Sequence, residues 1–205
     1  MLEGDVTTVT KTALQAAIAD KNRGLLVGGN EQKTILAAIE QLEKLNPTPQ
    51  PLKATKLLEG DWRLLYTTSQ DLLRIDQFPM LKLGAIYQCV RTAEAKVYNI
   101  AELSGIPFLA GFVSVAAQLE PVSNQRVNVK FERTVFGLQR LMGYQSASEF
   151  IQQLQTCQQF SWLKGIDLRI NSGERRGWIE ITYLDQDMRI ARGNQGNVFV
   201  LTKQS

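Results

Sequence analysis

The sequence predicts a mostly β protein: an antiparallel β-barrel with an α-helical N-terminal segment and one inserted helix. The chain has 205 residues, enough for one barrel-sized domain with an appendage. From Gly60 onward, apolar and polar residues alternate with the period of two that a strand imposes. Turn residues or loops separate most of these segments, and strands at such short intervals are typical of an antiparallel barrel or sandwich.

Residues 1–53 are predicted to form helices and a proline-rich linker, ahead of a barrel over residues 54–205. The stretch "KTALQAAIAD" repeats apolar residues at helical spacing. Asn30 is expected to cap a second helix that runs to about Leu45. The prolines of "NPTPQP" end that helix. Its apolar stripe consists of Ile35, Leu36, Ile39 and Leu42.

The barrel strands are predicted from alternation and from β-branched and aromatic content. The first five are "DWRLLYTTS", "AIYQCVRT", "AKVYNIAEL", "FVSVAAQLEPV" and "RVNVKFERTVFG". A helix then interrupts them, because Ser146 and Glu149 of "SASE" form a capping box before "FIQQLQTCQ". The remaining strands are "IDLRIN", "GWIEITYLD", "MRIAR" and "VFVLT".

The closing stretch "YLDQDMRIARGNQGNVFVLTK" concentrates acidic, basic and glycine residues, so it is either a site or a meander of strands. Alternation puts Ile179, Ile181 and Tyr183 on one face of a half-buried strand. "DQD" and "GNQGN" then occupy the positions of turns. Asp185 and Asp187 are too few carboxylates for a magnesium or calcium site without further ligands. We therefore expect turns and no metal here.

Composition excludes several function classes. The 23 basic and 20 acidic residues are scattered and give a net charge of +3, so a nucleic-acid partner is not expected. The chain has no histidine, which removes the usual general base, the usual zinc ligand and every Ser-His or Cys-His arrangement. We expect no catalytic residue and no cofactor. Cys89 and Cys157 are far apart and are interpreted as buried thiols of a reducing compartment.

No targeting or membrane-spanning segment is expected. "MLEGDVTTVTK" has acidic residues where a signal or transit peptide has basic ones. The longest uncharged run, Leu103 to Leu119, is interrupted by Gly105, Pro107 and Gly111, and it is shorter than the roughly 20 residues that cross a bilayer.

Alternation also predicts which residues face the barrel interior. "FVSVAAQLE" and "RVNVKFERTV" each place a run of apolar residues on one face, with small members at the middle, and these could line a cavity for an apolar ligand. Arg133 is in phase with them. Either the register slips at a bulge, or the arginine reaches into the cavity to meet a polar head group or a carboxylate. The candidate ligand-binding residues are Val113, Val115, Ala117, Leu119, Val127, Val129, Phe131 and Arg133.

Two stretches resemble a known family. "GDWRLLYTTS" and "TYLDQDMRIARGNQGNVFVLTK" are similar to the opening strand and the C-terminal signature of the plastid lipid-associated protein, or fibrillin, family. With "FERTVFG", the resemblance covers about residues 11 to 203, and the Gly-x-Trp of the first strand also resembles the opening motif of lipocalins. It implies a lipocalin-like barrel. The residues that occupy the family's pattern are Gly60, Trp62, Tyr183, Asp185, Arg189, Arg192 and Gly193.

If the barrel closes as a lipocalin does, Trp62 is expected to stack against an arginine of the last hairpin. Arg192 is the first choice and Arg189 the second.

The resemblance implies a non-catalytic protein that binds or organises isoprenoid lipids such as quinones and carotenoids, at thylakoid membranes or lipid droplets. It implies a peripheral location on the cytoplasmic side of the thylakoid, and the lack of a transit peptide suggests a cyanobacterial member. Two alternatives stay open. One is an interaction module that docks an enzyme of isoprenoid-quinone synthesis or a photosynthetic complex. The other is an enzyme such as a chromophore lyase.

Overall fold

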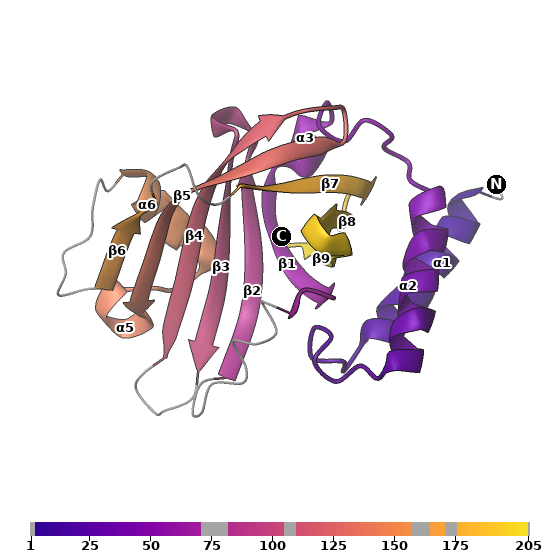
Figure 1. Ribbon diagram of the computed structural model, residues 1–205, viewed down its shortest axis with the longest axis horizontal. Helices are drawn as coiled ribbons and strands as arrows, with labels where there is room; N and C mark the ends of the chain where they lie inside the picture. Colours follow the sequence, from indigo (N-terminus) through magenta and orange to yellow (C-terminus); the bar gives the residue numbers. More distant parts are fainter. Residues whose placement is uncertain (1–2, 71–81, 105–109, 157–164, 171–175, 205) are drawn as a thin grey trace.

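A computed structural model describes residues 3–70, 82–104, 110–156, 165–170 and 176–204. It is an antiparallel β-barrel with helices at the N-terminus and one helical segment between strands, so the predicted fold is confirmed (Figure 1). The strands are β1 (Gly60–Thr67), β2 (Lys82–Arg91), β3 (Lys96–Ser104), β4 (Gly111–Pro121), β5 (Arg126–Leu138), β6 (Gly165–Arg169), β7 (Arg176–Leu184), β8 (Met188–Gly193) and β9 (Val198–Lys203). The helices are α1 (Glu3–Ile18), α2 (Gly29–Lys44), α3 (Thr55–Leu58), α5 (Gln139–Met142) and α6 (Ala147–Thr156), with short 3₁₀ turns η2 (Thr92–Glu94) and η3 (Asn194–Gly196).

Strand β5 closes the ring of strands and also pairs with a strand that lies outside the ring. The strand order is β4-β3-β2-β1-β9-β8-β7-β5-β6, and a further pairing of β4 with β5 completes a ring of strands. The first part of β5, residues 126–130, pairs with β7, whereas residues 133–137 pair with β6. Strand β6 is therefore an extension of the sheet beyond the ring, and its far edge pairs with no strand among the described residues.

The barrel interior is one apolar cluster to which strands from around the ring contribute, and α3 lies at one end of it (Figure 1). Trp62 is fully buried there, and its indole Nε1 donates a hydrogen bond to the Leu58 carbonyl oxygen at 3.0 Å. The cluster consists of Leu58, Trp62, Leu64, Leu83, Ile86, Val90, Val97, Ala101, Ala117, Val127, Val129, Ile181, Leu184 and Leu201.

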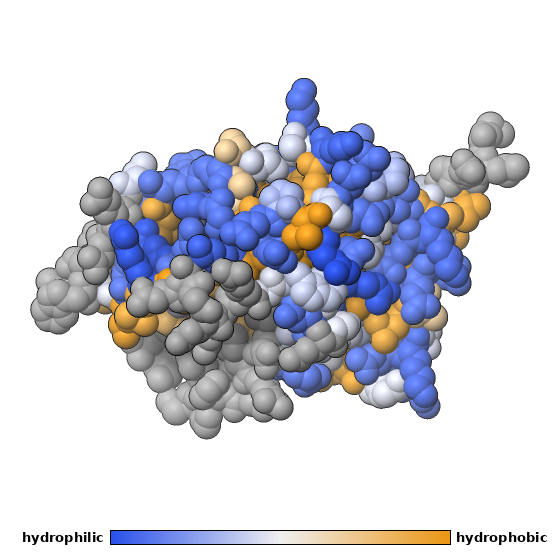
Figure 2. All heavy atoms as spheres, turned by 45° about the horizontal axis from the view of Figure 1, so that its top comes forward, coloured by the Kyte–Doolittle hydropathy of each residue, from blue (hydrophilic) through white to orange (hydrophobic). Residues whose placement is uncertain are grey.

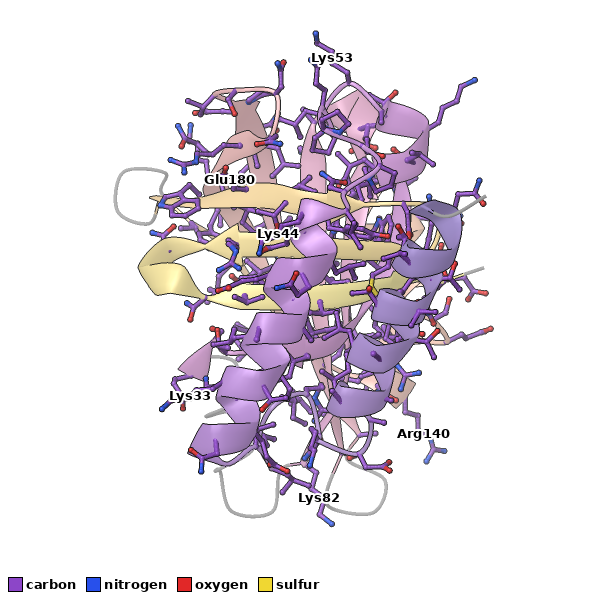
Figure 3. The ribbon with its side chains drawn as sticks, turned by 90° about the vertical axis from the view of Figure 1, so that its right-hand side faces the viewer. Lys33, Lys44, Lys53, Lys82, Arg140 and Glu180 are labelled. Atoms are coloured by element: carbon purple, nitrogen blue, oxygen red, sulfur yellow. The ribbon has the colours of Figure 1, made fainter. Side chains whose placement is uncertain are left out.

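Helices α1 and α2 pack on the outside of the barrel, across β7, β8 and β9 (Figure 3). The predicted stripe of α2 faces the sheet, since Ile35, Ile39 and Leu42 are buried in a cluster with residues of β1, β7, β8 and β9. None of the helices in the described part of the chain is long and apolar enough to cross a bilayer.

The predicted Asn30 cap of α2 is wrong. The helix begins at Gly29, and Gly28 is the N-cap residue. The Glu31 carboxylate accepts a hydrogen bond from the Gly28 backbone N–H at 3.1 Å, which satisfies a donor at the helix start without a side-chain cap.

Helices α5 and α6 cover a second outer face, formed by β2, β3, β4 and β5. Phe150 of α6 packs edge-on against Phe112 of β4, with ring centroids 4.4 Å apart. The predicted start of α6 is confirmed, because Ser146 Oγ accepts the Glu149 backbone N–H at 3.2 Å. Cys89 is a buried free thiol in this cluster, and Cys157 lies outside the described residues.

On β5 and β7, β-bulges change the predicted orientation of the residues that follow them. On β5, Phe131 pairs with Ala117 and Arg133 pairs with Ala116, so Glu132 is an extra residue. On β7, Ile181 pairs with Ala191 and Tyr183 pairs with Ile190, so Thr182 is extra. A residue that follows a bulge points to the opposite face from the one that alternation predicts.

Candidate functional site

The inner face of the sheet formed by β4, β5 and β6 is the main candidate surface. Val113 on β4 pairs with Phe136 on β5, and Phe136 pairs with Ile166 on β6. These residues follow one another across the sheet because paired residues of neighbouring strands point to the same side. The next row across the same face consists of Val115, Thr134 and Leu168.

Exposure increases along this face from the core to β6. Ala117 is fully buried, and Val113 and Val115 are partly exposed. Beyond them, the exposed fractions reach 41% at Phe136, 61% at Ile166 and 53% at Leu168. We call the last three the apolar rim.

In the view of Figure 2, hydrophobic residues form small patches between hydrophilic ones. One patch lies at the end where Figure 1 places α5 and β6. Large apolar side chains that lie together on a surface suit an apolar ligand or partner.

The seven apolar candidates all lie on the inner side of the barrel. Five of them belong to the interior cluster or pack against it: Ala117, Leu119, Val127, Val129 and Phe131. Leu119 and Val127 also line an interior cavity of about 40 Å³. Their inward orientation follows from the alternation of β4 and of the first part of β5. These residues are Val113, Val115, Ala117, Leu119, Val127, Val129 and Phe131.

Arg133, expected as a candidate in the cavity, lies instead on the outer face. The bulge at Glu132 turns it outward, as the bulge interpretation of its position predicted. Its Nε and Nη2 donate to the two carboxylate oxygens of Asp167 at 2.9 and 2.7 Å, and Nη1 donates to the Leu154 carbonyl at 3.4 Å. The arginine thus meets a carboxylate, but one that belongs to β6 of the same chain.

Arg189 is the arginine that does face the interior. Its guanidinium carbon lies 4.9 Å from the centre of the Trp62 ring, so the second choice for the stacked arginine is confirmed. Its Nη2 donates to Gln88 Oε1 at 2.6 Å. The residue is 4% exposed, and burial lowers its pKa to about 9, so it remains a cation at neutral pH. Lys203 Nζ lies 5.2 Å from the same ring centre.

The first choice, Arg192, is wrong, because Arg192 lies on the outer face of β8. Its Nε and Nη2 donate to the Glu43 carboxylate of α2 at 2.8 and 2.6 Å. The hydrogen bond from Arg192 to Glu43 raises the pKa of the guanidinium. The Thr182 hydroxyl donates to the same carboxylate at 2.6 Å. Arg192 therefore joins the α2 helix to the barrel.

Asp185 begins the turn between β7 and β8, and the turn interpretation is confirmed. Its Oδ1 accepts the backbone N–H groups of Asp187 and Met188 at 3.0 and 2.7 Å. Its Oδ2 accepts hydrogen bonds from Lys11 and Tyr183, each at 2.7 Å. Burial raises the pKa of Asp185, but these four donors outweigh burial and hold it at about 2.

No group of three or more potential metal ligands occurs in the part of the chain that the structure describes. The oxygens of Asp185 are already engaged by donors, so we retain the prediction that this turn binds no metal. Titration with magnesium, calcium and manganese should give no heat.

The remaining motif residues are structural. Tyr183 follows the bulge at Thr182 and so lies in the outer cluster under α1 and α2, not beside Ile181 as alternation predicted. Gly60 has φ of +122° at the start of β1, a conformation that favours glycine. A Cβ at Gly193 would come within 3.2 Å of the Phe199 ring.

Comparison with known proteins gives the family. The PAP_fibrillin family model matches residues 8–202. The chain belongs to the PAP_fibrillin family. It is 32% identical to a chromoplast-specific carotenoid-associated protein of Cucumis sativus, over 95% of this chain and 67% of that protein. It is 31% identical to a probable plastid-lipid-associated protein 1 of Arabidopsis thaliana, over 95% of this chain and 68% of that protein. A light-induced chloroplastic protein of Solanum tuberosum is 29% identical over 95% of this chain and 67% of its own length.

The resemblance found in the opening and closing strands is thereby confirmed. What sequence reasoning missed in this PAP_fibrillin chain is Gln88, the partner of Arg189. Its signal was present: in "AIYQCVRT", Gln88 is in phase with Ile86 and Val90, which both face the interior. A polar residue in phase with buried apolar residues points into the same core.

Proposed function

We propose that this PAP_fibrillin protein binds or organises an apolar lipid without catalysing a reaction, and that the inner face of β4, β5 and β6 receives it. One observation carries the proposal: this apolar face is continuous from the buried Ala117 to the exposed rim. A ligand that entered at Ile166 would meet the apolar side chains of Phe136 and then Val113 on its way inward. The names of the relatives, carotenoid-associated and plastid-lipid-associated, support a lipid of that kind.

The energetics favour a long apolar molecule. Covering apolar surface contributes about 25 cal/mol per Å², so a tail that buries on the order of 300 Å² gains several kcal/mol before ordering costs. Micromolar binding needs about 8 kcal/mol net, so the apolar tail must bury more surface than this to offset the ordering costs. Isoprenoid lipids such as prenylquinones and carotenoids have the required shape and chemistry.

The location that fits this ligand is the cytoplasmic side of a thylakoid membrane, peripherally attached, or the surface of lipid droplets. The relatives carry the words chloroplastic and chromoplastic in their names, which supports a plastid location. Within this proposal the protein is a plastid protein or its cyanobacterial counterpart.

A second function is favoured by a different observation. The interior cavity at Leu119 and Val127 measures about 40 Å³, whereas cavities for drug-sized ligands measure about 300–1,000 Å³. If the barrel does not expand, the apolar rim serves as the docking surface for a protein, such as an enzyme of isoprenoid-quinone synthesis or a photosynthetic complex.

One experiment separates these functions. Purified protein is mixed with a plastoquinone analogue, and bound quinone is measured by extraction and by quenching of tryptophan fluorescence. Lipid binding predicts saturable uptake at micromolar concentration, and the double variant Ile166→Asp with Leu168→Asp should weaken it about tenfold or more, since charged groups at the rim oppose entry. The control is Val122→Asp, which adds charge at an exposed valine of the β4–β5 turn. Absence of uptake by the wild type would reject lipid binding in favour of docking.

A further inference from the structure

Arg189 differs from the arginines of the barrel that form ion pairs. On the outer surface, four arginines each lie against a carboxylate: Arg91 with Asp61, Arg126 with Glu180, Arg133 with Asp167 and Arg192 with Glu43. Within the described ranges, Arg189 forms no ion pair, although it is more deeply buried. Its Nε has no hydrogen-bond acceptor among these residues.

The surroundings of Arg189 do not neutralise its charge. The side-chain amide oxygen of Gln88 and the π face of Trp62 are neutral partners. The second cation near this ring, Lys203, donates to the Leu57 carbonyl oxygen, which is also neutral. A buried cation without a carboxylate is unfavourable, so the interior attracts an anion.

The space beside the guanidinium matches a small head group. Arg189 and Gln88 line the cavity of about 40 Å³, whose other walls are the apolar side chains of Leu52, Leu58, Val90, Val97, Leu119, Val127, Ile179 and Ile181. A space that admits a water needs roughly 10–15 Å³, so this one holds a group of a few atoms. The apolar walls select a head group that is attached to an apolar body.

We propose that Arg189 and Gln88 form the recognition site for the carboxylate of an apolar carboxylic acid, such as a fatty acid, bound inside the barrel. The carboxylate accepts hydrogen bonds from Arg189 Nε and from the Gln88 amide nitrogen, and it neutralises the buried cation. This inference rests on the proposed uptake of apolar molecules by the barrel and adds apolar carboxylic acids to the isoprenoid lipids as a ligand class. Trp62 holds the guanidinium in place by stacking.

The test compares two probes with the same apolar body: a fluorescent polyene fatty acid and its methyl ester, titrated at pH 8. Wild-type protein should bind the acid about tenfold or more tightly than the ester, because only the acid brings a charge to Arg189. Arg189→Met keeps the volume and removes the charge, so the acid should lose this advantage while ester affinity stays within about threefold. The matched control is Arg126→Met, because Arg126 also stacks on a tryptophan, at 4.3 Å from the Trp178 ring centre, but on the exposed surface. It should keep the preference for the acid.

The outcomes separate the two proposals. Equal binding of acid and ester by the wild type overturns the Arg189 site and leaves lipid uptake standing. Failure of both probes to bind overturns the Arg189 site, and the quinone assay decides lipid uptake separately. If Arg189→Met does not fold, the wild type alone decides: the preference for the acid should stay constant from pH 8 to pH 6 and shrink by pH 4, as the free acid becomes protonated, while ester binding stays unchanged. If Arg189→Met folds and still binds the acid more tightly than the ester, the proposed Arg189 site is also overturned.

Discussion

The Arg192 guanidinium of β8 donates two hydrogen bonds to the Glu43 carboxylate of α2, at 2.8 and 2.6 Å. The Glu43 side chain is largely buried at this contact, so the pair is shielded from solvent on one side. This ion pair links the C-terminal hairpin to a helix near the N-terminus, across a sequence separation of 149 residues.

A double-mutant cycle should measure this link. Arg192→Met and Glu43→Gln, alone and together, are expected to give a coupling free energy of about 1 kcal/mol in urea unfolding. The pair Arg126–Glu180 is more exposed and serves as the control, with an expected coupling of about 0.5 kcal/mol or less. Equal coupling free energies in both pairs would show that burial of Glu43 does not strengthen its interaction with Arg192.

Asp185 should make stability depend on pH. Its pKa is about 2 in the folded protein and 3.8 ordinarily, so the folded state favours the charged form. The stabilisation is complete above the unfolded pKa and is lost as pH falls through the folded pKa. It amounts to about 2 kcal/mol. Asp185→Asn should therefore be less stable than wild type at pH 6, and the difference should shrink between about pH 5 and pH 2.

Urea unfolding at several pH values checks this expectation, with Asp187→Asn as the control in the same turn. Asp187 is mostly exposed, so its replacement should change the pH dependence less. If the difference in unfolding free energy between wild type and Asp185→Asn stays constant down to pH 2, the pKa of Asp185 is not lowered by its contacts in this turn.

The loop between α1 and α2 is expected to need a glycine at position 24 in order to pack against Thr67 of β1. The φ of Gly24 is +114°, and a Cβ there would lie 2.4 Å from the Thr67 carbonyl oxygen. The neighbouring Arg23 carbonyl accepts the Thr67 N–H at 2.9 Å, so the loop cannot easily withdraw. Gly24→Ala should cost about 2 kcal/mol or more in urea unfolding. Gly29→Ala, where no atom lies within 4 Å of the added Cβ, should be neutral or slightly stabilising.

Two substitutions on β4 should distinguish a block of lipid uptake from a loss of stability caused by overpacking of the core. Val115 is partly exposed on the inner face, so Val115→Trp should block quinone uptake while the circular dichroism spectrum stays that of the wild type. Ala117 is fully buried against Phe131, so Ala117→Trp should lower stability by about 1–3 kcal/mol. Uptake by Val115→Trp at wild-type affinity would exclude this face as the ligand path.

Much of the barrel was predictable because strand alternation is a local property. The orientation of the residues from Val113 to Leu119 follows from the period of two along an unbroken strand, and it is correct. The turn at Asp185 was predictable for the same reason, since an aspartate that accepts backbone N–H groups two and three residues later needs only its own neighbours.

The sequence by itself determined the element types, the turns and the inward face of each regular strand, because these depend on neighbours within a few residues. Tertiary structure alone decided where the bulges fall, and the extra residues Glu132 and Thr182 turned Arg133 and Tyr183 outward. It also decided which arginine enters the barrel. Both faces of β8 are buried, one in the interior and one under α1 and α2, so its alternation could not distinguish them. Arg189 and Arg192 are three positions apart and point to opposite faces, and only the packing of the helical hairpin on one face assigns the other to the interior.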